Sequence, residues 1–209
     1  SRRPGRARRW LRRFARLLAA ASLSRVTASG LEHLRGLGPA VFVANHASFA
    51  DVVVVLANLP ASIRFAAKGR LATYPILKTI IRRGGYLRIE KTELSQRMEG
   101  AGEVGATLTA GESMFVFPEG RFVRAPGLLP FRLGAFRAAA EAGCPVVPVA
   151  LAGTRRMFPA GTLLLRPGRI RVVVGPPLQP RSADWNEVIR LRDEARRAIA
   201  EAAGEESAA

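Results

Sequence analysis

Short apolar segments alternate with segments of helical periodicity along most of this chain, and this alternation restricts the fold more than any other feature. The apolar, β-rich segments cover residues 38–45, 62–68, 84–91, 113–120 and 144–153, followed by a predicted hairpin over 161–175. Helical spacing or capping residues mark 51–59, 74–83, 94–111, 134–143 and 185–203. Because strand–helix–strand units form parallel sheets covered by helices, we expect a single-domain α/β sandwich with a mixed, largely parallel central sheet.

The length and composition favour one compact domain. A chain of 209 residues, of which 48% are hydrophobic, can bury one sizeable core. We divide it into a basic amphipathic helix (1–24), a globular domain (25–204) and a short disordered tail (205–209). The longest apolar run near the N-terminus, residues 17–23, is far shorter than the roughly 20 residues that span a bilayer, so we expect no spanning helix there.

The N-terminal helix predicted over residues 8–23 carries an apolar face and many arginines. Its apolar side chains recur at helical spacing and are Trp10, Leu11, Phe14, Leu17, Leu18 and Ala21. One interpretation is an interfacial helix that sinks this face to headgroup depth while arginines hold anionic lipid phosphates. The other is a helix packed on the protein's own core with a solvated basic face. The arginines ahead of the helix favour the first, and with it a peripheral location at the cytoplasmic face of a membrane.

The chain is strongly basic. Its 33 basic and 16 acidic residues give a formal net charge of +17, which attracts nucleic acid, membrane headgroups or phosphorylated substrates. We recognise no nucleic-acid-binding module and aromatic residues make up only 7%, so nucleic acid is not an expected partner. Cys144 is the only cysteine, which excludes an intrachain disulfide and a thiolate metal cluster and favours a reducing compartment.

The segment "NHASFAD" places a histidine where a buried strand ends and a carboxylate five residues later. His46 has the unperturbed pKa range of a general base at neutral pH, and Asp51 can fix its tautomer and stabilise the imidazolium. A substrate hydroxyl would then take the part that serine takes in a hydrolase triad, without a covalent enzyme intermediate. The alternative is a helix-capping aspartate beside a core histidine that the backbone satisfies.

Two further polar clusters follow predicted strands, "GGYLRIEK" and "FPEGR". Glu119 comes directly after a strand and a turn-forming proline, and Gly120 lets backbone amides approach a ligand. Arg121 and Arg124 can hold a phosphate bidentately, although an ordinary turn and a solvated loop explain the same residues. Because strand ends meet at one edge of a parallel sheet, we expect these clusters to form a site with His46.

Taken together, four blocks in order resemble the motifs of the glycerolipid acyltransferase family, the PlsC-type lysophosphatidic acid and glycerol-3-phosphate acyltransferases. The first is N-H-x-x-x-x-D, the second a glycine followed by a basic residue, the third F-P-E-G and the fourth a V-P-V strand. The matching residues are Asn45, His46 and Asp51, then "GGYLRIEK", then Phe117, Pro118, Glu119 and Gly120, and finally Pro148 between two valines. The resemblance extends from about residue 30 to about residue 175.

This resemblance implies transfer of a fatty acyl group from acyl-coenzyme A or acyl carrier protein to a hydroxyl of a lysophospholipid such as 1-acyl-glycerol-3-phosphate, in phospholipid biosynthesis. It implies that His46 deprotonates the hydroxyl and that Asp51 orients His46. By the same resemblance Glu119 and Gly120 shape the acceptor site, and a basic residue of the second motif holds the acceptor phosphate. It further implies the glycerol-3-phosphate acyltransferase-like fold and no cofactor beyond the acyl-thioester.

The chain departs from the family pattern at two phosphate-binding positions. Lys91 stands where the second motif usually ends in arginine, with Arg88 three residues earlier as a substitute. Many members read F-P-E-G-T-R, whereas this chain places Arg121 at the threonine position and Phe122 at the arginine position. These differences bear on the acceptor more than on the reaction, because lysine offers a point charge where arginine offers a planar fork.

Other functions remain open on the sequence. Within enzymes, the same fold serves an acyltransferase for a non-phosphate acceptor such as an aminolipid, or a thioesterase. From another class, a non-catalytic basic protein bound to anionic membrane or nucleic acid also fits the net charge. We expect no required metal, since His33 and His46 are the only imidazoles.

Overall fold

A central β-sheet and the helices on its two faces make up the fold. The structure is a computed structural model, and it describes residues 4–60, 62–68, 87–89, 99–121, 123–159 and 165–205. The strands are β1 (Arg25–Ser29), β2 (Val41–Ala44), β3 (Arg64–Lys68), β4 (Leu87–Ile89), β5 (Met114–Val116), β6 (Val146–Ala152) and β7 (Arg169–Val174). The helices are α1 (Pro4–Ala21), α2 (Ala50–Asn58), α4 (Glu99–Thr109), α5 (Gly134–Glu141), α6 (Thr154–Met157) and α7 (Trp185–Ala203), with a short 3-10 helix η1 (Leu31–Leu34).

The strands form one seven-stranded sheet in the order β1-β7-β6-β2-β5-β3-β4. Every neighbouring pair is parallel except β6 and β7, which run antiparallel. The predicted α/β sandwich with a mixed, largely parallel sheet is therefore confirmed. β2 lies between β5 and β6, and Val43 is in register with Val116 on one side and Pro148 on the other. The carboxyl ends of these three parallel strands consequently meet at one edge of the sheet, where ligand sites of such folds form.

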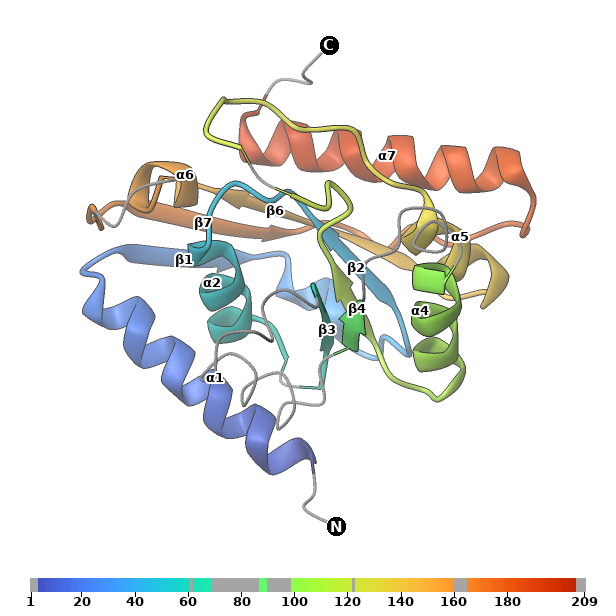
Figure 1. The fold of residues 1–209 in the computed structure, drawn as a ribbon, viewed down its shortest axis with the longest axis horizontal. Helices are drawn as coiled ribbons and strands as arrows, with labels where there is room; N and C mark the ends of the chain where they lie inside the picture. The colour runs from blue at the N-terminus through green and yellow to red at the C-terminus, as the bar shows by residue number, and fades with distance from the viewer. Residues whose placement is uncertain are drawn as a thin grey trace.

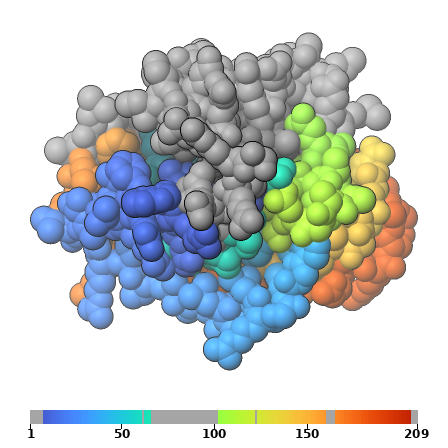
Figure 2. Space-filling view, turned by 90° about the horizontal axis from the view of Figure 1, so that it is seen from below, coloured from blue at the N-terminus to red at the C-terminus, as the bar shows by residue number. Residues whose placement is uncertain are grey.

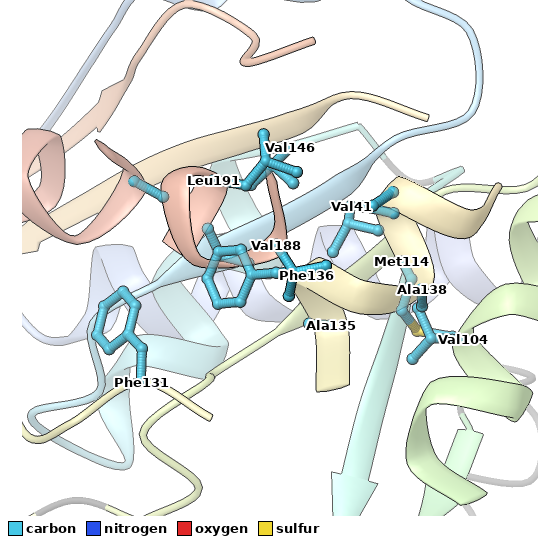
Figure 3. Packing of buried hydrophobic residues seen from close by; sticks show 14 of the residues in the cluster. Val41, Val104, Met114, Phe131, Ala135, Phe136, Ala138, Val146, Val188 and Leu191 are labelled. Carbon is cyan, nitrogen blue, oxygen red and sulfur yellow. The ribbon is translucent and has the colours of Figure 1, made fainter. Parts of the chain in front are cut away.

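Helices cover both faces of the sheet, with α7 across one face and α1 and α2 on the other (Figure 1). The alternating side chains of β2 supply both cores, because successive residues of a strand point to opposite faces. Val41 and Val43 pack with residues of α4, α5 and α7, whereas Phe42 and Ala44 pack with residues of α2. The labelled residues of Figure 3, among them Phe136 of α5, lie in the first of these cores.

The predicted hairpin over 161–175 is wrong in its pairing. The strand β7 forms, but its two neighbours in the sheet are β1 and β6, so the described pairing joins it to residues 25–29 and 149–152 and not to the first half of the predicted hairpin. Sequence reasoning also assigned no structure to "RVTAS", which forms the edge strand β1. The helix predicted over 74–83 and the first residues of the hairpin, 161–164, lie outside the described residues.

Helix α1 packs against the domain through small residues and arginine side chains. Ala15 is buried, the Nε atom of Arg16 donates a hydrogen bond of 3.0 Å to the carbonyl of Ala57 in α2, and Arg8 pairs with Glu112 at 3.4 Å. The large hydrophobic side chains that it leaves in solvent are Trp10, Phe14, Leu17 and Leu18. The N-terminal segment lies at the surface in the view from below (Figure 2).

This arrangement combines the two interpretations of the N-terminal helix. It packs on the protein itself, yet the face that it leaves in solvent carries large hydrophobic side chains together with Arg9 and Arg13. None of the described helices is both long enough and apolar enough to cross a bilayer.

Candidate active site

The carboxylate of Asp51 organises the loop between β2 and α2. Its Oδ2 atom accepts hydrogen bonds from Nδ1 of His46 at 2.9 Å, from the amide of Ala47 at 2.7 Å and from the amide of Ser48 at 2.8 Å. Asp51 is fully buried in the first turn of α2, where the helix dipole also favours a negative charge. The carboxylate thus holds the loop and the imidazole at once.

This contact fixes the tautomer of His46. A carboxylate only accepts hydrogen bonds, so Nδ1 carries the proton and the lone pair of the neutral imidazole lies on Nε2. The side chain of His46 is 15% exposed, whereas that of Asp51 is 0% exposed, so the ring reaches solvent while its carboxylate does not. The predicted pair is therefore in contact, in the arrangement of a general base and its orienting group.

Asn45 joins the end of β2 to β6. Its Nδ2 atom donates to the carbonyl of Leu151 at 2.9 Å, and its Oδ1 atom accepts from the amide of Leu151 at 2.8 Å. Asn45 is 1% exposed, so no water competes for these two bonds. The paired bonds hold His46, the next residue, at the edge of the sheet.

The third motif touches His46 twice. The ring of Phe117 stacks on the imidazole with 4.1 Å between the ring centroids. The Oε1 atom of Glu119 accepts a hydrogen bond of 2.7 Å from the backbone amide of His46, and its Oε2 atom accepts one of 2.9 Å from the amide of Leu129. Glu119 is 5% exposed, so it links the histidine loop to the segment after F-P-E-G from inside the protein.

Burial controls the titration of Glu119. It raises the pKa of this carboxyl above its ordinary value, because the charged form loses its hydration. The two backbone hydrogen bonds and the positive charges of His46 and Arg155 oppose the shift. Since both of its oxygens are held by amides, Glu119 acts here as a structural link between two loops.

A guanidinium lies over the F-P-E-G turn. A Cβ atom on Gly120 would come within 2.9 Å of Cζ of Arg132, so the arginine side chain occupies the space that a larger residue would fill. Arg132 is exposed, and its guanidinium has no hydrogen bond or ion pair within the described ranges. Sequence reasoning did not single out this arginine. The available signal was its position within the region, about residues 30 to 175, that resembles the family.

The remaining predicted residues are Arg121, Pro148, Arg88 and Lys91. Arg121 is exposed directly after Gly120, and Pro148 lies inside β6 with Gly175 against its ring. Arg88 belongs to β4, which is the edge strand of the described sheet beside β3 and is separated from β2 by β3 and β5. Lys91 lies outside the described residues. In the part of the chain that the structure describes, no three His, Cys, Asp or Glu side chains gather to hold a metal ion, and the expectation of no required metal stays a prediction.

Comparison with known proteins identifies the family. The model of a family described as Acyltransferase matches residues 25–152, which include the His46 and Glu119 motifs. A chloroplastic 1-acyl-sn-glycerol-3-phosphate acyltransferase of Brassica napus is 34% identical over 174 residues, which cover 82% of this chain and 49% of that protein. The corresponding Arabidopsis thaliana protein is 33% identical over 179 residues, 85% of this chain and 49% of that protein. The chain belongs to this acyltransferase family.

A solved structure confirms the fold. The 1-acyl-sn-glycerophosphate acyltransferase PlsC of Thermotoga maritima superposes with a TM-score of 0.78 at 24% identity, over 97% of this chain and 83% of that one. At this identity the likeness speaks to the fold alone. The chain spans about half the length of the curated plant relatives described above.

We predict that Asn45→Ala destabilises the protein by about 2–4 kcal/mol, because it leaves the buried amide and carbonyl of Leu151 without their partners. Asn58→Ala is the matched control, since it removes one bond from a half-buried side chain to the helix carbonyl of Val54. Urea unfolding curves measure both. Equal losses for the two variants would contradict the role of Asn45 as a link between β2 and β6.

Proposed function

We propose that this protein transfers a fatty acyl group from an acyl-thioester to the free hydroxyl of a lysophospholipid, with 1-acyl-glycerol-3-phosphate as the acceptor. The observation that carries the proposal is the contact between His46 Nδ1 and the buried Asp51 carboxylate, within the motif that the family model covers. Membership of the acyltransferase family and relatives that are named 1-acyl-sn-glycerol-3-phosphate acyltransferases support it. In this role the protein serves phospholipid biosynthesis.

The chemistry follows from the tautomer. Nε2 of His46 takes the proton of the acceptor hydroxyl while its oxygen attacks the thioester carbonyl. Asp51 stabilises the imidazolium that forms. When the tetrahedral intermediate collapses, the carbon–sulfur bond breaks, and the imidazolium returns the proton to the thiolate of coenzyme A or acyl carrier protein. No covalent enzyme intermediate and no cofactor takes part.

The acceptor phosphate binds at the F-P-E-G turn in this proposal. Arg132 lies over Gly120, and Arg121 follows it, so two exposed guanidinium groups flank a turn whose glutamate contacts the amide of His46. Arginine matches phosphate oxygens with a planar fork of donors. Arg132 thereby takes the role of the arginine of the family pattern, whose position is occupied by Phe122 in this chain. Arg88 and Lys91 are the other residues that we propose to bind the acceptor phosphate.

The exposed face of α1 supports a location at the cytoplasmic surface of an anionic membrane. Trp10 and Leu17 are both 69% exposed, and a globular protein in water gains nothing from presenting such side chains. Sunk to headgroup depth, they would anchor the enzyme peripherally, with Arg9 and Arg13 beside lipid phosphates. Such an anchor brings the site to substrates that are themselves lipids.

One assay separates the candidate functions. The full chain is mixed with acyl-coenzyme A or acyl-acyl carrier protein and a panel of phosphorylated and neutral lysolipids, and products are identified by mass spectrometry. We expect diacylated product from the phosphorylated acceptor. Product only from aminolipids would favour the acyltransferase for a non-phosphate acceptor. Thiol release without acceptor would favour a thioesterase, and the absence of any turnover would favour a non-catalytic basic protein.

His46→Ala should lower kcat/KM by several orders of magnitude, because it removes the base, and Asp51→Asn should cost less but still at least roughly 100-fold, by analogy with triad losses. Initial rates of thiol release with saturating acceptor measure both effects. Circular dichroism confirms that the variants fold. A His46→Ala enzyme that keeps more than a few percent of the wild-type rate would rule out this mechanism.

Arg132→Gln should raise KM for a phosphorylated lysolipid by roughly tenfold or more, since a charge-assisted contact contributes about 1.5–3 kcal/mol. KM for a neutral acceptor should stay within twofold. Arg137→Gln is the matched control, because Arg137 is an exposed arginine of α5 whose guanidinium already pairs with Glu141. Equal effects of the two variants on both acceptors would remove Arg132 from the phosphate site.

The double variant Trp10→Ser, Phe14→Ser should weaken binding to anionic vesicles by at least roughly tenfold, because each large apolar side chain contributes about 1.5–3 kcal/mol on burial. Vesicle sedimentation measures the binding. Trp185→Ser serves as the control, since Trp185 is also more than half exposed but lies at the start of α7 on the opposite face of the sheet. If both variants bind as the wild type does, α1 is no membrane anchor.

A further inference from the structure

Arg155 holds the segment that follows the F-P-E-G turn. It lies on α6, shortly after β6, and its guanidinium donates hydrogen bonds to the carbonyls of three alternate residues of that segment. Nη1 contacts the carbonyl of Val123 at 2.8 Å and that of Ala125, and Nη2 contacts the carbonyl of Gly127 at 3.4 Å. One side chain thus gathers residues 123–127 around a single cation.

Glu205 completes this arrangement from beyond the end of α7. Its carboxylate faces Arg155, with Nη2 at 3.0 Å from both carboxylate oxygens, and its Oε2 atom accepts a hydrogen bond of 2.6 Å from the amide of Gly127. The two side chains are only 18% and 15% exposed, so solvent screens the pair weakly. The predicted disordered tail began at this residue. Residues 206–209 lie outside the described residues.

The held segment leads directly to the active site. Leu128 is buried in the core, and the amide of the next residue, Leu129, donates to Glu119. The other oxygen of Glu119 accepts from the amide of His46. A continuous path of bonds therefore runs from Glu205 and Arg155 through Gly127 and the following residues to the backbone of the catalytic histidine.

We propose that the Arg155–Glu205 ion pair is a strap that positions Glu119, and through it His46, by fixing the segment 123–129. Arg155 and Glu205 are positioning residues, because neither touches the reacting atoms. The structural role of this ion pair does not depend on the proposed function. Its effect on catalysis rests on that function.

The strap also supplies charge at the site. The charged or titratable groups that act on Glu119 are His46 from the end of β2 and Arg155 from α6. Arg132 lies over the adjacent Gly120, Asp51 contacts Nδ1 of His46, and Glu205 pairs with Arg155. Burial raises the pKa of Glu119, and the cation of Arg155 opposes that rise. Removing the cation therefore raises the pKa of Glu119 further. On acidification the carboxylate then becomes protonated at a higher pH, and the activity that depends on it is lost at that higher pH.

The experiment compares Arg155→Met and Glu205→Gln with Arg190→Met. Arg190 is a matched control, since it forms a similarly shielded ion pair with Glu187 on α7 and, among the residues that the structure describes, bonds only to its own helix and to Gln179. Amide hydrogen exchange at His46 and Leu129, read by NMR on the full chain, reports the strap directly. We expect exchange at both amides to speed up by at least roughly tenfold in Arg155→Met, with a smaller effect in Glu205→Gln and none in Arg190→Met.

Kinetics test the catalytic effect. In Arg155→Met we expect kcat to fall by at least roughly tenfold with KM nearly unchanged, and the acid limb of the pH–rate profile to move to higher pH, while Arg190→Met keeps both. Unchanged exchange at both amides in Arg155→Met would overturn the strap. Faster exchange with an unaltered profile would overturn its catalytic role. Should Arg155→Met not fold, Glu205→Gln decides on amide exchange and kcat alone, because it keeps the cation of Arg155 and so does not raise the pKa of Glu119. A wild-type chain without acyl transfer contradicts the proposed function alone.

Discussion

The buried carboxylate of Asp51 is the interaction on which the rest of the site depends. It joins the end of β2 to the start of α2 by accepting the amides of Ala47 and Ser48, and with the same oxygen it accepts Nδ1 of His46. Because the carboxylate is buried, loss of these bonds would destabilise the protein, since an unpaired charge inside a protein costs several kcal/mol. The loop that carries His46, the proposed base, is therefore built around the carboxylate that orients its ring.

The other contacts extend this centre across the sheet. Asn45 links the loop to β6, and Glu119 links it to the segment after β5, so the loop at the end of β2 is bonded to the segments of both neighbouring strands. Their parallel register brings these points to one edge without any long connection. The fold contributes pre-organisation, which lets a neutral imidazole act without rearranging the groups around it.

The sequence predicted those parts of the site whose geometry is local. His46 and Asp51 are five residues apart across a strand end and a helix start, a spacing that allows the aspartate of the first helical turn to reach back to the histidine. The cores were likewise predictable, because the strands are apolar and the helices show their periodicity. The order of the strands in the sheet was harder to predict from the sequence. "RVTAS" is short and largely exposed, and it becomes β1 only because β7 offers it an edge.

Contacts between distant residues escaped sequence reasoning for a physical reason. Arg155 and Glu205 are separated by fifty positions, and each looks like an ordinary surface charge until the fold brings them to the same segment. Glu119 was expected to shape the acceptor site, but its spacing could not reveal that both oxygens bond to backbone amides. Arg132 reaches Gly120 only because the chain returns to the F-P-E-G turn.

The central claim is that Asp51 fixes His46 in the tautomer whose Nε2 atom accepts the substrate proton. Nitrogen-15 NMR of the imidazole, at a pH where it is neutral, distinguishes the two tautomers directly. We predict a protonated Nδ1 and an unprotonated Nε2 for His46 in the wild-type protein, and loss of that preference in Asp51→Asn. A neutral His46 with its proton on Nε2 would contradict the account.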